Sequence, residues 1–227
     1  MRMRGAALLV LGCVLTSASV AARSISDNFV DASREIDGLI VEIRYFGSDN
    51  FTGRPVAGYE APICLLTREA ASALANVQQR LAPFGLGLKV FDCYRPVQAV
   101  ADFVAWAKDL QDERRKAEYY PSVPKTDLFK QGYIADRSSH SRGSTVDVTL
   151  VDLQTKRELS MGSPYDFFDP VSWPAAAADP DIRAKRLLLQ TLMSAAGFAP
   201  YEQEWWHFTL KNEPFPDTYF DFPVAVR

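Results

Sequence analysis

The chain has 227 residues, of which 48% are hydrophobic and 23% are charged, as in an ordinary globular protein. That length suits one domain with a sizeable core and is short for two. The formal net charge of −3 gives no basic surface for nucleic acid, which we therefore exclude as a partner.

The first 22 residues have the pattern of a secretory signal peptide. Arg2 and Arg4 form a basic start, residues 6–14 are apolar, and small residues suited to cleavage follow. The apolar run is much shorter than the roughly 20 residues that a membrane-spanning helix needs. We therefore predict a signal peptide over residues 1–22, an exported catalytic domain over residues 23–227, and no membrane segment after cleavage.

The three cysteines leave two questions open. Residues 10–13 loosely resemble a lipoprotein cleavage box, which would place a lipid on Cys13. Cys64 and Cys93 stay in the mature chain. Export allows these two to pair as a disulfide, but two buried free thiols fit the sequence equally well.

The first half of the exported chain contains predicted strands and one well-marked helix. Alternating apolar and polar residues predict a strand over residues 39–45. Thr67 can cap a helix over residues 68–81, in which apolar side chains recur at helical spacing. A further strand is expected over residues 86–90.

The second half has fewer regular elements. Pro96 fits the first turn of another helix. Residues 113–136 are polar and interrupted by prolines, which predicts an irregular covering region. Strands are expected over residues 146–150 and 205–210, and residues 179–197 carry the signals of a capped helix. We predict the α+β class, as a single compact domain with a mainly antiparallel sheet flanked by helices.

The two histidines of the chain each lie near a carboxylate. Asp147 follows His140 by seven residues, and Glu204 precedes His207 by three. Two imidazoles and one carboxylate suit catalytic zinc, which keeps a fourth position for water. We predict one Zn²⁺ held by His140, Asp147 and His207, with Glu204 as the general base. Structural histidines and an exposed loop carboxylate are the alternatives that the spacing leaves open.

Two parts of this arrangement depend on local geometry. Side chains three apart in a regular strand point to opposite faces. Glu204 can therefore act beside His207 only from a bend or loop at the strand entrance.

Arg95 lies in Asp-Cys-Tyr-Arg-Pro at residues 92–96. Over a metal it would stabilise an oxyanion, but it could equally be an ordinary cation at a strand end.

Motifs along the whole chain resemble those of the D-alanyl-D-alanine dipeptidases, the zinc family that includes the vancomycin-resistance dipeptidase. They are Asp-x-Tyr-Arg-Pro at 92–96, Ser-x-His-x-x-Gly-x-x-x-Asp at 138–147, Glu-x-x-His at 204–207, and the stretches 45–53, 161–166 and 219–223. The resemblance covers nearly all of the exported chain. It implies the α+β fold that these enzymes share with zinc D-Ala-D-Ala carboxypeptidases and the hedgehog signalling domain.

The resemblance implies an activity, the hydrolysis of the dipeptide D-alanyl-D-alanine to two D-alanines. His140, Asp147 and His207 match the zinc ligands of the family. Glu204 matches its catalytic base, and Arg95 matches an arginine that stabilises the transition state.

The resemblance also implies how a small D,D-dipeptide would be held. Ser138 matches a residue that holds the carboxylate end of the substrate. Tyr45 and Asp166 match residues around its free ammonium group, and Asp92 matches a residue that orients Arg95.

Two other functions remain open from the sequence. A D-Ala-D-Ala carboxypeptidase acting on longer peptidoglycan peptides would share the zinc motifs, and a zinc-stabilised binding module would require neither Glu204 nor Arg95. The export signal argues against a cytoplasmic resistance role. It favours turnover of dipeptide released from the cell wall, in the bacterial periplasm. The sequence does not indicate an oligomeric state.

Overall fold

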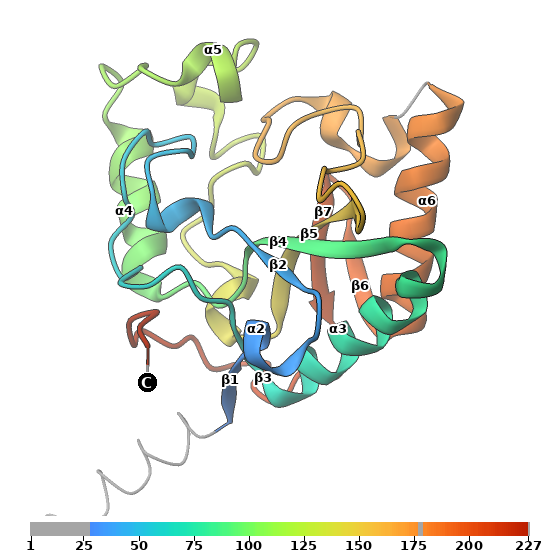
Figure 1. Ribbon diagram of the computed structural model, residues 1–227. Coiled ribbons are helices and arrows are strands. Elements are labelled where there is room, and N and C mark those ends of the chain that lie inside the picture. The colour runs from blue at the N-terminus through green and yellow to red at the C-terminus, as the bar shows by residue number, and fades with distance from the viewer. Residues whose placement is uncertain (1–27, 177–178, 227) are drawn as a thin grey trace, which may run out of the picture.

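The structure is a computed structural model that describes residues 28–176 and 179–226. At its centre is a five-stranded sheet (Figure 1). In spatial order, its strands are β2 (Ile40–Val41), β4 (Leu86–Asp92), β5 (Thr145–Asp152), β7 (Glu204–Leu210) and β6 (Phe198–Tyr201). Strand β2 pairs with β4 in parallel, and the other neighbouring pairs of this sheet are antiparallel. The predicted α+β class with a mainly antiparallel sheet is confirmed.

Helices lie on two sides of this sheet. The longer ones are α3 (Arg68–Leu81), α4 (Val97–Lys108) and α6 (Pro180–Ala195). The short elements are β1 (Phe29–Asp31), α2 (Ala32–Glu35), η1 (Arg44–Phe46), β3 (Leu65–Thr67), η2 (Ala82–Phe84), α5 (Lys116–Tyr119), η3 (Lys125–Asp127), η4 (Ser139–Arg142), η5 (Pro170–Ser172) and η6 (Pro174–Ala176). Helices α3 and α6 contact each other and the sheet, and α4 lies at the other side of the molecule (Figure 1). In the described ranges, no helix has the length and apolar character needed to cross a membrane.

Most predicted elements are confirmed by the structure. The side-chain oxygen of Thr67 accepts a hydrogen bond from the backbone N–H of Ala70 at 3.3 Å, which caps α3. Asp179 caps α6 in the same way, and Gly197 follows the end of that helix in the left-handed conformation. The strands predicted at residues 86–90, 146–150 and 205–210 form parts of β4, β5 and β7.

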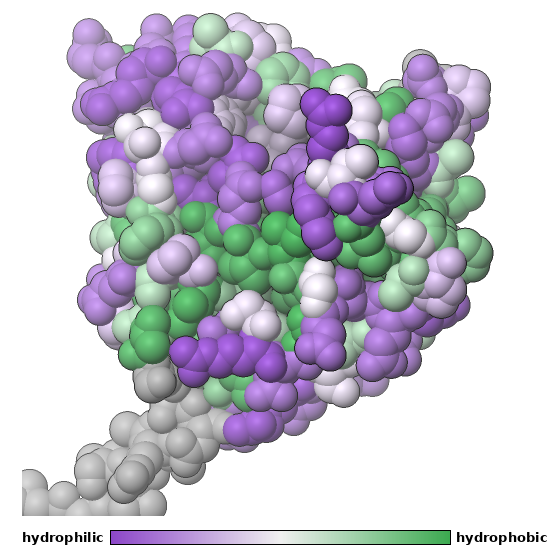
Figure 2. All heavy atoms as spheres, in the orientation of Figure 1, coloured by the Kyte–Doolittle hydropathy of each residue, from purple (hydrophilic) through white to green (hydrophobic). Residues whose placement is uncertain are grey.

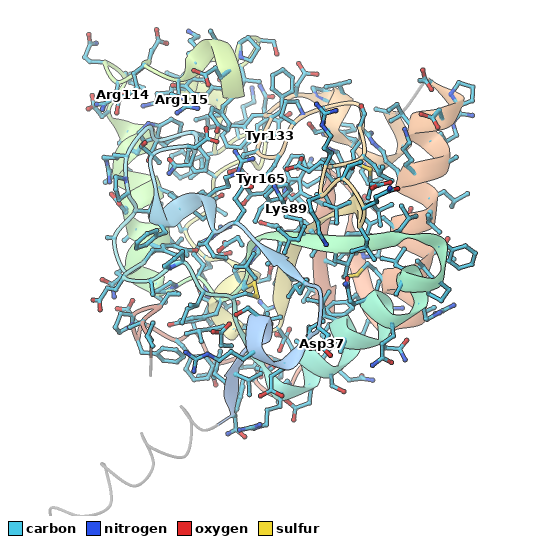
Figure 3. All side chains as sticks on the ribbon, viewed as in Figure 1. Asp37, Lys89, Arg114, Arg115, Tyr133 and Tyr165 are labelled. Carbon is cyan, nitrogen blue, oxygen red and sulfur yellow. A yellow bond between two sulfur atoms is a disulfide. The ribbon has the colours of Figure 1, made fainter. Side chains whose placement is uncertain are left out.

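Residues 113–136 form the irregular covering region that the sequence predicts. It contains α5 and η3, and the surface around α5 is strongly hydrophilic (Figure 2). Arg114 and Arg115 lie at the outer edge of the molecule (Figure 3). One buried cation fixes this region to the domain, because Lys125 Nζ donates to two carbonyl groups at the C-terminal end of α4, both at 2.8 Å.

The strand predicted over residues 39–45 is wrong beyond Val41, because the chain turns and forms η1 instead. The side-chain amide of Asn50 donates to the backbone oxygens of Arg44, Gly47 and Arg54 at 2.8–3.2 Å. These local hydrogen bonds satisfy carbonyl groups that would otherwise need a neighbouring strand. The turn also directs Tyr45 inward, where its side chain is 1% exposed.

A disulfide joins Cys64, just before β3, to Cys93, just after β4. Both residues are buried. This decides between the two alternatives that the sequence left open for the cysteines. The bond fixes the segment that carries Arg95 to a part of the chain 29 residues earlier.

Replacing both cysteines with alanine is expected to lower the free energy of unfolding by about 2–4 kcal/mol, because the cross-link restricts the unfolded chain. Chemical denaturation of the zinc-free protein measures this change. Reduction with dithiothreitol should destabilise the wild type to a similar extent and leave the double variant unchanged. A double variant as stable as the oxidised wild type would contradict this prediction.

Candidate metal centre and active site

Three neighbouring strands bring charged side chains into one row across the sheet. Asp147 of β5 lies directly opposite His207 of β7 on one side and opposite Asp92 of β4 on the other. Residues that face each other on antiparallel strands project from the same face of the sheet. The register of β4 shifts between Val90 and Asp92, so that Asp92 rather than Phe91 faces Asp147. This irregularity turns a carboxylate toward the site.

His140 approaches the row from the short helical turn η4, which directly precedes β5. The hydroxyl oxygen of Ser138 accepts a hydrogen bond from the backbone N–H of His140 at 3.3 Å and caps this turn. Gly143 ends the turn with a φ of 81°, and a Cβ atom there would lie 2.2 Å from the ring of Phe29. Only glycine combines this backbone conformation with such a close approach. The local sequence therefore sets the position of His140.

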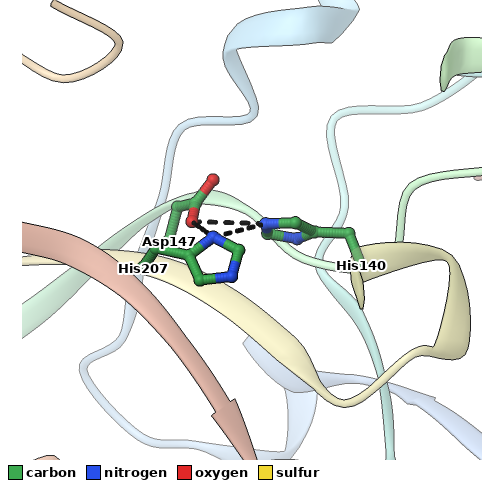
Figure 4. Close-up of side chains that lie close together, drawn as sticks. All are labelled: His140, Asp147 and His207. Atoms are coloured by element: carbon green, nitrogen blue, oxygen red, sulfur yellow. Dashed lines mark hydrogen bonds and ion pairs between the residues drawn. The ribbon is translucent and has the colours of Figure 1, made fainter. Parts of the chain in front are cut away.

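The side chains of His140, Asp147 and His207 converge on one point (Figure 4). His140 Nε2 lies 3.3 Å from Asp147 Oδ1, His207 Nδ1 lies 3.1 Å from that same oxygen, and the two nitrogens are 3.3 Å apart. Zinc bonds of about 2.0–2.1 Å at tetrahedral angles place neighbouring ligand atoms roughly 3.3 Å apart. Asp147 Oδ1 is also buried without a hydrogen bond from the described residues. The three side chains therefore fit a zinc ion.

The outer atoms of these three side chains have partners of their own. His140 Nδ1 donates to the backbone oxygen of Cys93 at 2.7 Å, and His207 Nε2 lies 3.2 Å from the hydroxyl of Ser139. The first contact leaves the lone pair of His140 Nε2 facing the centre, as metal-binding imidazoles require. The second does the same for His207 Nδ1 when the hydroxyl of Ser139 accepts the hydrogen bond. Burial alone would raise the pKa of Asp147, but the two imidazoles hold that pKa far below its ordinary value.

Glu204 occupies the strand entrance that its predicted role requires. It is the first residue of β7, and the register between β6 and β7 shifts between Pro200 and Tyr201. Its Oε2 lies 3.5 Å from Nδ1 of His207, so the two side chains face the same point. Burial raises the pKa of Glu204 to about 7. A metal cation beside it would lower that value.

Arg95 is held at the site by a buried carboxylate. Its Nε and Nη2 both lie 2.9 Å from Asp92 Oδ2, and Tyr59 donates its hydroxyl to the other oxygen of Asp92 at 2.7 Å. The guanidinium group lies over the ring of Tyr45 at 5.1 Å, and its Nη1 is 3.4 Å from the hydroxyl of Ser138. Arg95 is therefore fixed between Tyr45 and Ser138, the residues predicted to bind opposite ends of the substrate.

Asp166 presents a buried carboxylate to the same site. Its backbone is left-handed, with φ 58°, and its carboxylate accepts a hydrogen bond from the Tyr45 hydroxyl at 2.8 Å. Left-handed residues other than glycine carry strain and cluster at functional sites. Burial, followed by the charge of Asp147, raises the pKa of Asp166 well above its ordinary value. No lysine or arginine of the described ranges forms an ion pair with it, so it can receive a cationic group from a ligand.

The structure adds Tyr165, which the sequence analysis did not select. Its hydroxyl lies 3.1 Å from Asp147 Oδ2 and 3.0 Å from the hydroxyl of Tyr45. Each hydroxyl carries one proton, so the three contacts from Asp147 to Asp166 cannot all be hydrogen bonds while both carboxylates are ionised. Tyr165 lies in the interior of the molecule (Figure 3). Tyr165 lies directly before Asp166 in the stretch 161–166, which carries part of the family resemblance, and this position is the sequence signal that could have identified it.

A cavity of about 450 Å³ opens over these residues. Its charged lining comprises Asp147, Asp166, Glu204, His140, His207, Arg95, Arg137 and Arg142. The volume lies within the range of small-molecule sites. Acidic and basic groups around one pocket suit a small ligand that carries both charges.

Two imidazoles and a carboxylate, with a second carboxylate and an arginine beside them, form the set of side chains that a metallopeptidase site requires. A model of the D-ala-D-ala dipeptidase family matches residues 26–225, and the chain belongs to this family. Proteins named D-alanyl-D-alanine dipeptidase from Streptomyces coelicolor and Enterococcus faecalis are 43% and 41% identical to it over 88% of this chain and 100% of theirs. One from Escherichia coli is 31% identical over 82% of this chain and 86% of its own length.

These comparisons confirm the resemblance read from the sequence motifs. The structure brings all nine predicted site residues into one region, but their individual roles stay predictions. The nine are Tyr45, Asp92, Arg95, Ser138, His140, Asp147, Asp166, Glu204 and His207.

Proposed function

We propose that the protein is a zinc metallopeptidase that hydrolyses D-alanyl-D-alanine to two D-alanines. The observation that carries the proposal is the convergence of His140, Asp147 and His207, with Glu204 3.5 Å from His207. The names of the related proteins support the choice of substrate. We propose one Zn²⁺ for each chain.

The chain's own groups supply the proton transfers of the proposed reaction. When bound, zinc would polarise the scissile carbonyl and lower the pKa of water. Glu204 accepts a proton from the attacking water and delivers it to the leaving amine. Arg95 stabilises the negative charge that develops on the carbonyl oxygen. Asp92 keeps the guanidinium of Arg95 in place through contacts at 2.9 Å.

The remaining predicted residues hold the two ends of the dipeptide. Asp166 and Tyr45 receive its ammonium group, since Asp166 is a buried carboxylate without an ion-pair partner in the described ranges. Ser138 binds its carboxylate end. An ammonium bound to Asp166 restricts cleavage to dipeptides with a free amino end, because an acylated nitrogen carries no charge.

The test is to measure zinc content and D-alanine release from D-Ala-D-Ala and from its N-acetylated form. We expect turnover of the free dipeptide alone, loss of activity on chelation, and recovery on adding Zn²⁺. Turnover of the acetylated form would identify a carboxypeptidase instead. Bound zinc without either activity would identify a binding protein.

We further propose that residues 1–22 are removed on export, so that residues 23–227 act in the periplasm on dipeptide released from the cell wall. The apolar run after Arg2 and Arg4 supports this proposal. N-terminal sequencing of the protein recovered from the periplasm tests it. A mature protein beginning at Cys13 would indicate a lipoprotein, and an intact Met1 would reject export by cleavage.

A further inference from the structure

We infer that Arg137 binds the carboxylate of the substrate and sets the preference of the site for a free carboxyl end. This inference rests on the proposed dipeptidase function. It starts from the three arginines that line the cavity, Arg95, Arg137 and Arg142. A dipeptide that places its ammonium at Asp166 needs a cationic group at its other end.

Two of these arginines already contact buried or partly buried carboxylates. Arg95 contacts Asp92 at 2.9 Å through two nitrogens. Arg142 contacts Glu213 through Nε at 2.9 Å and through Nη2 at 2.8 Å. Arg142 therefore already has a carboxylate partner, and Arg95, which Asp92 holds in place, is assigned to the carbonyl oxygen and not to the carboxylate end of the dipeptide.

Arg137 differs from both, because it pairs with no carboxylate in the described part of the chain. Its guanidinium carbon lies 3.9 Å from the centre of the Tyr219 ring. An aromatic face attracts the guanidinium without neutralising its charge or using its N–H donors. The ring also limits the freedom of the side chain, which lowers the entropy cost of binding an anion. Arg137 is thus an exposed cation that lines the cavity, is oriented by the ring of Tyr219 and has no carboxylate partner in the described residues.

The place of Arg137 along the chain agrees with this role. It directly precedes Ser138, the residue that we propose to hold the carboxylate end of the substrate. The hydroxyl of Ser138 lies 3.4 Å from Arg95 Nη1. A serine hydroxyl donates a single hydrogen bond and carries no charge. A guanidinium group matches both oxygens of a carboxylate. Ser138 and Arg137 together complement a carboxylate better than Ser138 alone.

The test compares D-Ala-D-Ala with its C-terminal amide, which has the same shape but no negative charge. In Arg137→Gln we expect kcat/KM for the acid to fall roughly 10–100-fold, mainly through KM. For the amide, kcat/KM should change by less than about twofold, because the uncharged amide forms no charge-assisted hydrogen bond with Arg137 in the wild type either. Arg137→Lys should retain part of the preference for the acid. Unchanged zinc content and thermal unfolding would show that the variants are folded.

Two further variants act as controls. Arg80→Gln removes the same charge at an exposed position of α3 outside the cavity, and it should leave kcat/KM for both substrates unchanged. Tyr219→Leu should weaken the preference for the acid, whereas Tyr219→Phe keeps the ring and should preserve most of it.

Equal losses on acid and amide in Arg137→Gln, or no loss on either, would overturn the inference while leaving the dipeptidase function intact. A zinc-loaded wild type that hydrolyses neither substrate would overturn the dipeptidase function itself, and the role of Arg137 with it.

Discussion

Replacing Glu204 with glutamine is expected to lower kcat by about 10²–10⁴-fold, the contribution typical of a positioned general base. The amide has nearly the same shape as the carboxylate, but it cannot accept the proton of the attacking water. The position of residue 204 at the entrance of β7, where the register with β6 shifts, should not change in this variant. Steady-state kinetics on D-Ala-D-Ala, together with zinc content, measure the effect.

Glu202 provides the matched control for this variant. It is an exposed carboxylate two residues earlier, outside the cavity lining, so Glu202→Gln makes the same chemical change without touching the site. It should turn over substrate at the wild-type rate. A Glu204→Gln variant with near-normal turnover, or one that has lost its zinc, would remove Glu204 from the role of base.

Replacing Arg95 with glutamine is expected to reduce kcat by about 10²–10³-fold, as for other donors that stabilise an oxyanion. The same change should also destabilise the fold by about 3–5 kcal/mol, because it leaves a buried charge unpaired. The unpaired group is Asp92, whose side chain is fully buried. Burial already raises the pKa of Asp92, with Arg95 opposing the shift.

A second variant separates these two effects of Arg95. In the double variant Arg95→Gln with Asp92→Asn, both charges are removed together, so most of the lost stability should return. Turnover should remain low, because no cation faces the carbonyl oxygen. Urea denaturation, zinc content and kcat of both variants test this. Recovery of turnover in the double variant would show that Arg95 acts only by neutralising Asp92.

The sequence predicted the site more completely than the details of its surroundings. His140 and His207 are the only histidines of the chain, and each lies near a carboxylate in a dense motif. Such residues can be recognised without coordinates. Helix α3 was equally predictable, because Thr67 and the apolar spacing after it are local signals.

What the sequence left undecided depends on contacts between distant segments. The shift in β4 that turns Asp92 toward Asp147 is a matter of strand register, which no local pattern marks. Pairing of Cys64 with Cys93 required the two backbone segments to lie side by side. The strand predicted over residues 39–45 failed because the amide of Asn50, outside that window, stabilises a turn instead.

The distribution of the three proposed metal ligands over the fold has a consequence for the rate of metal exchange. Asp147 and His207 stand opposite each other on paired strands, so the sheet holds the backbone of both residues in place. His140 lies on the four-residue turn η4 and is the one ligand free of the strand ladder. We therefore expect the exchange of a bound ion to depend on movement of this turn more than on movement of the strands. A Cβ at Gly143 would lie 2.2 Å from the ring of Phe29, so a substitution there would disturb this turn and is expected to speed the exchange of a bound ion.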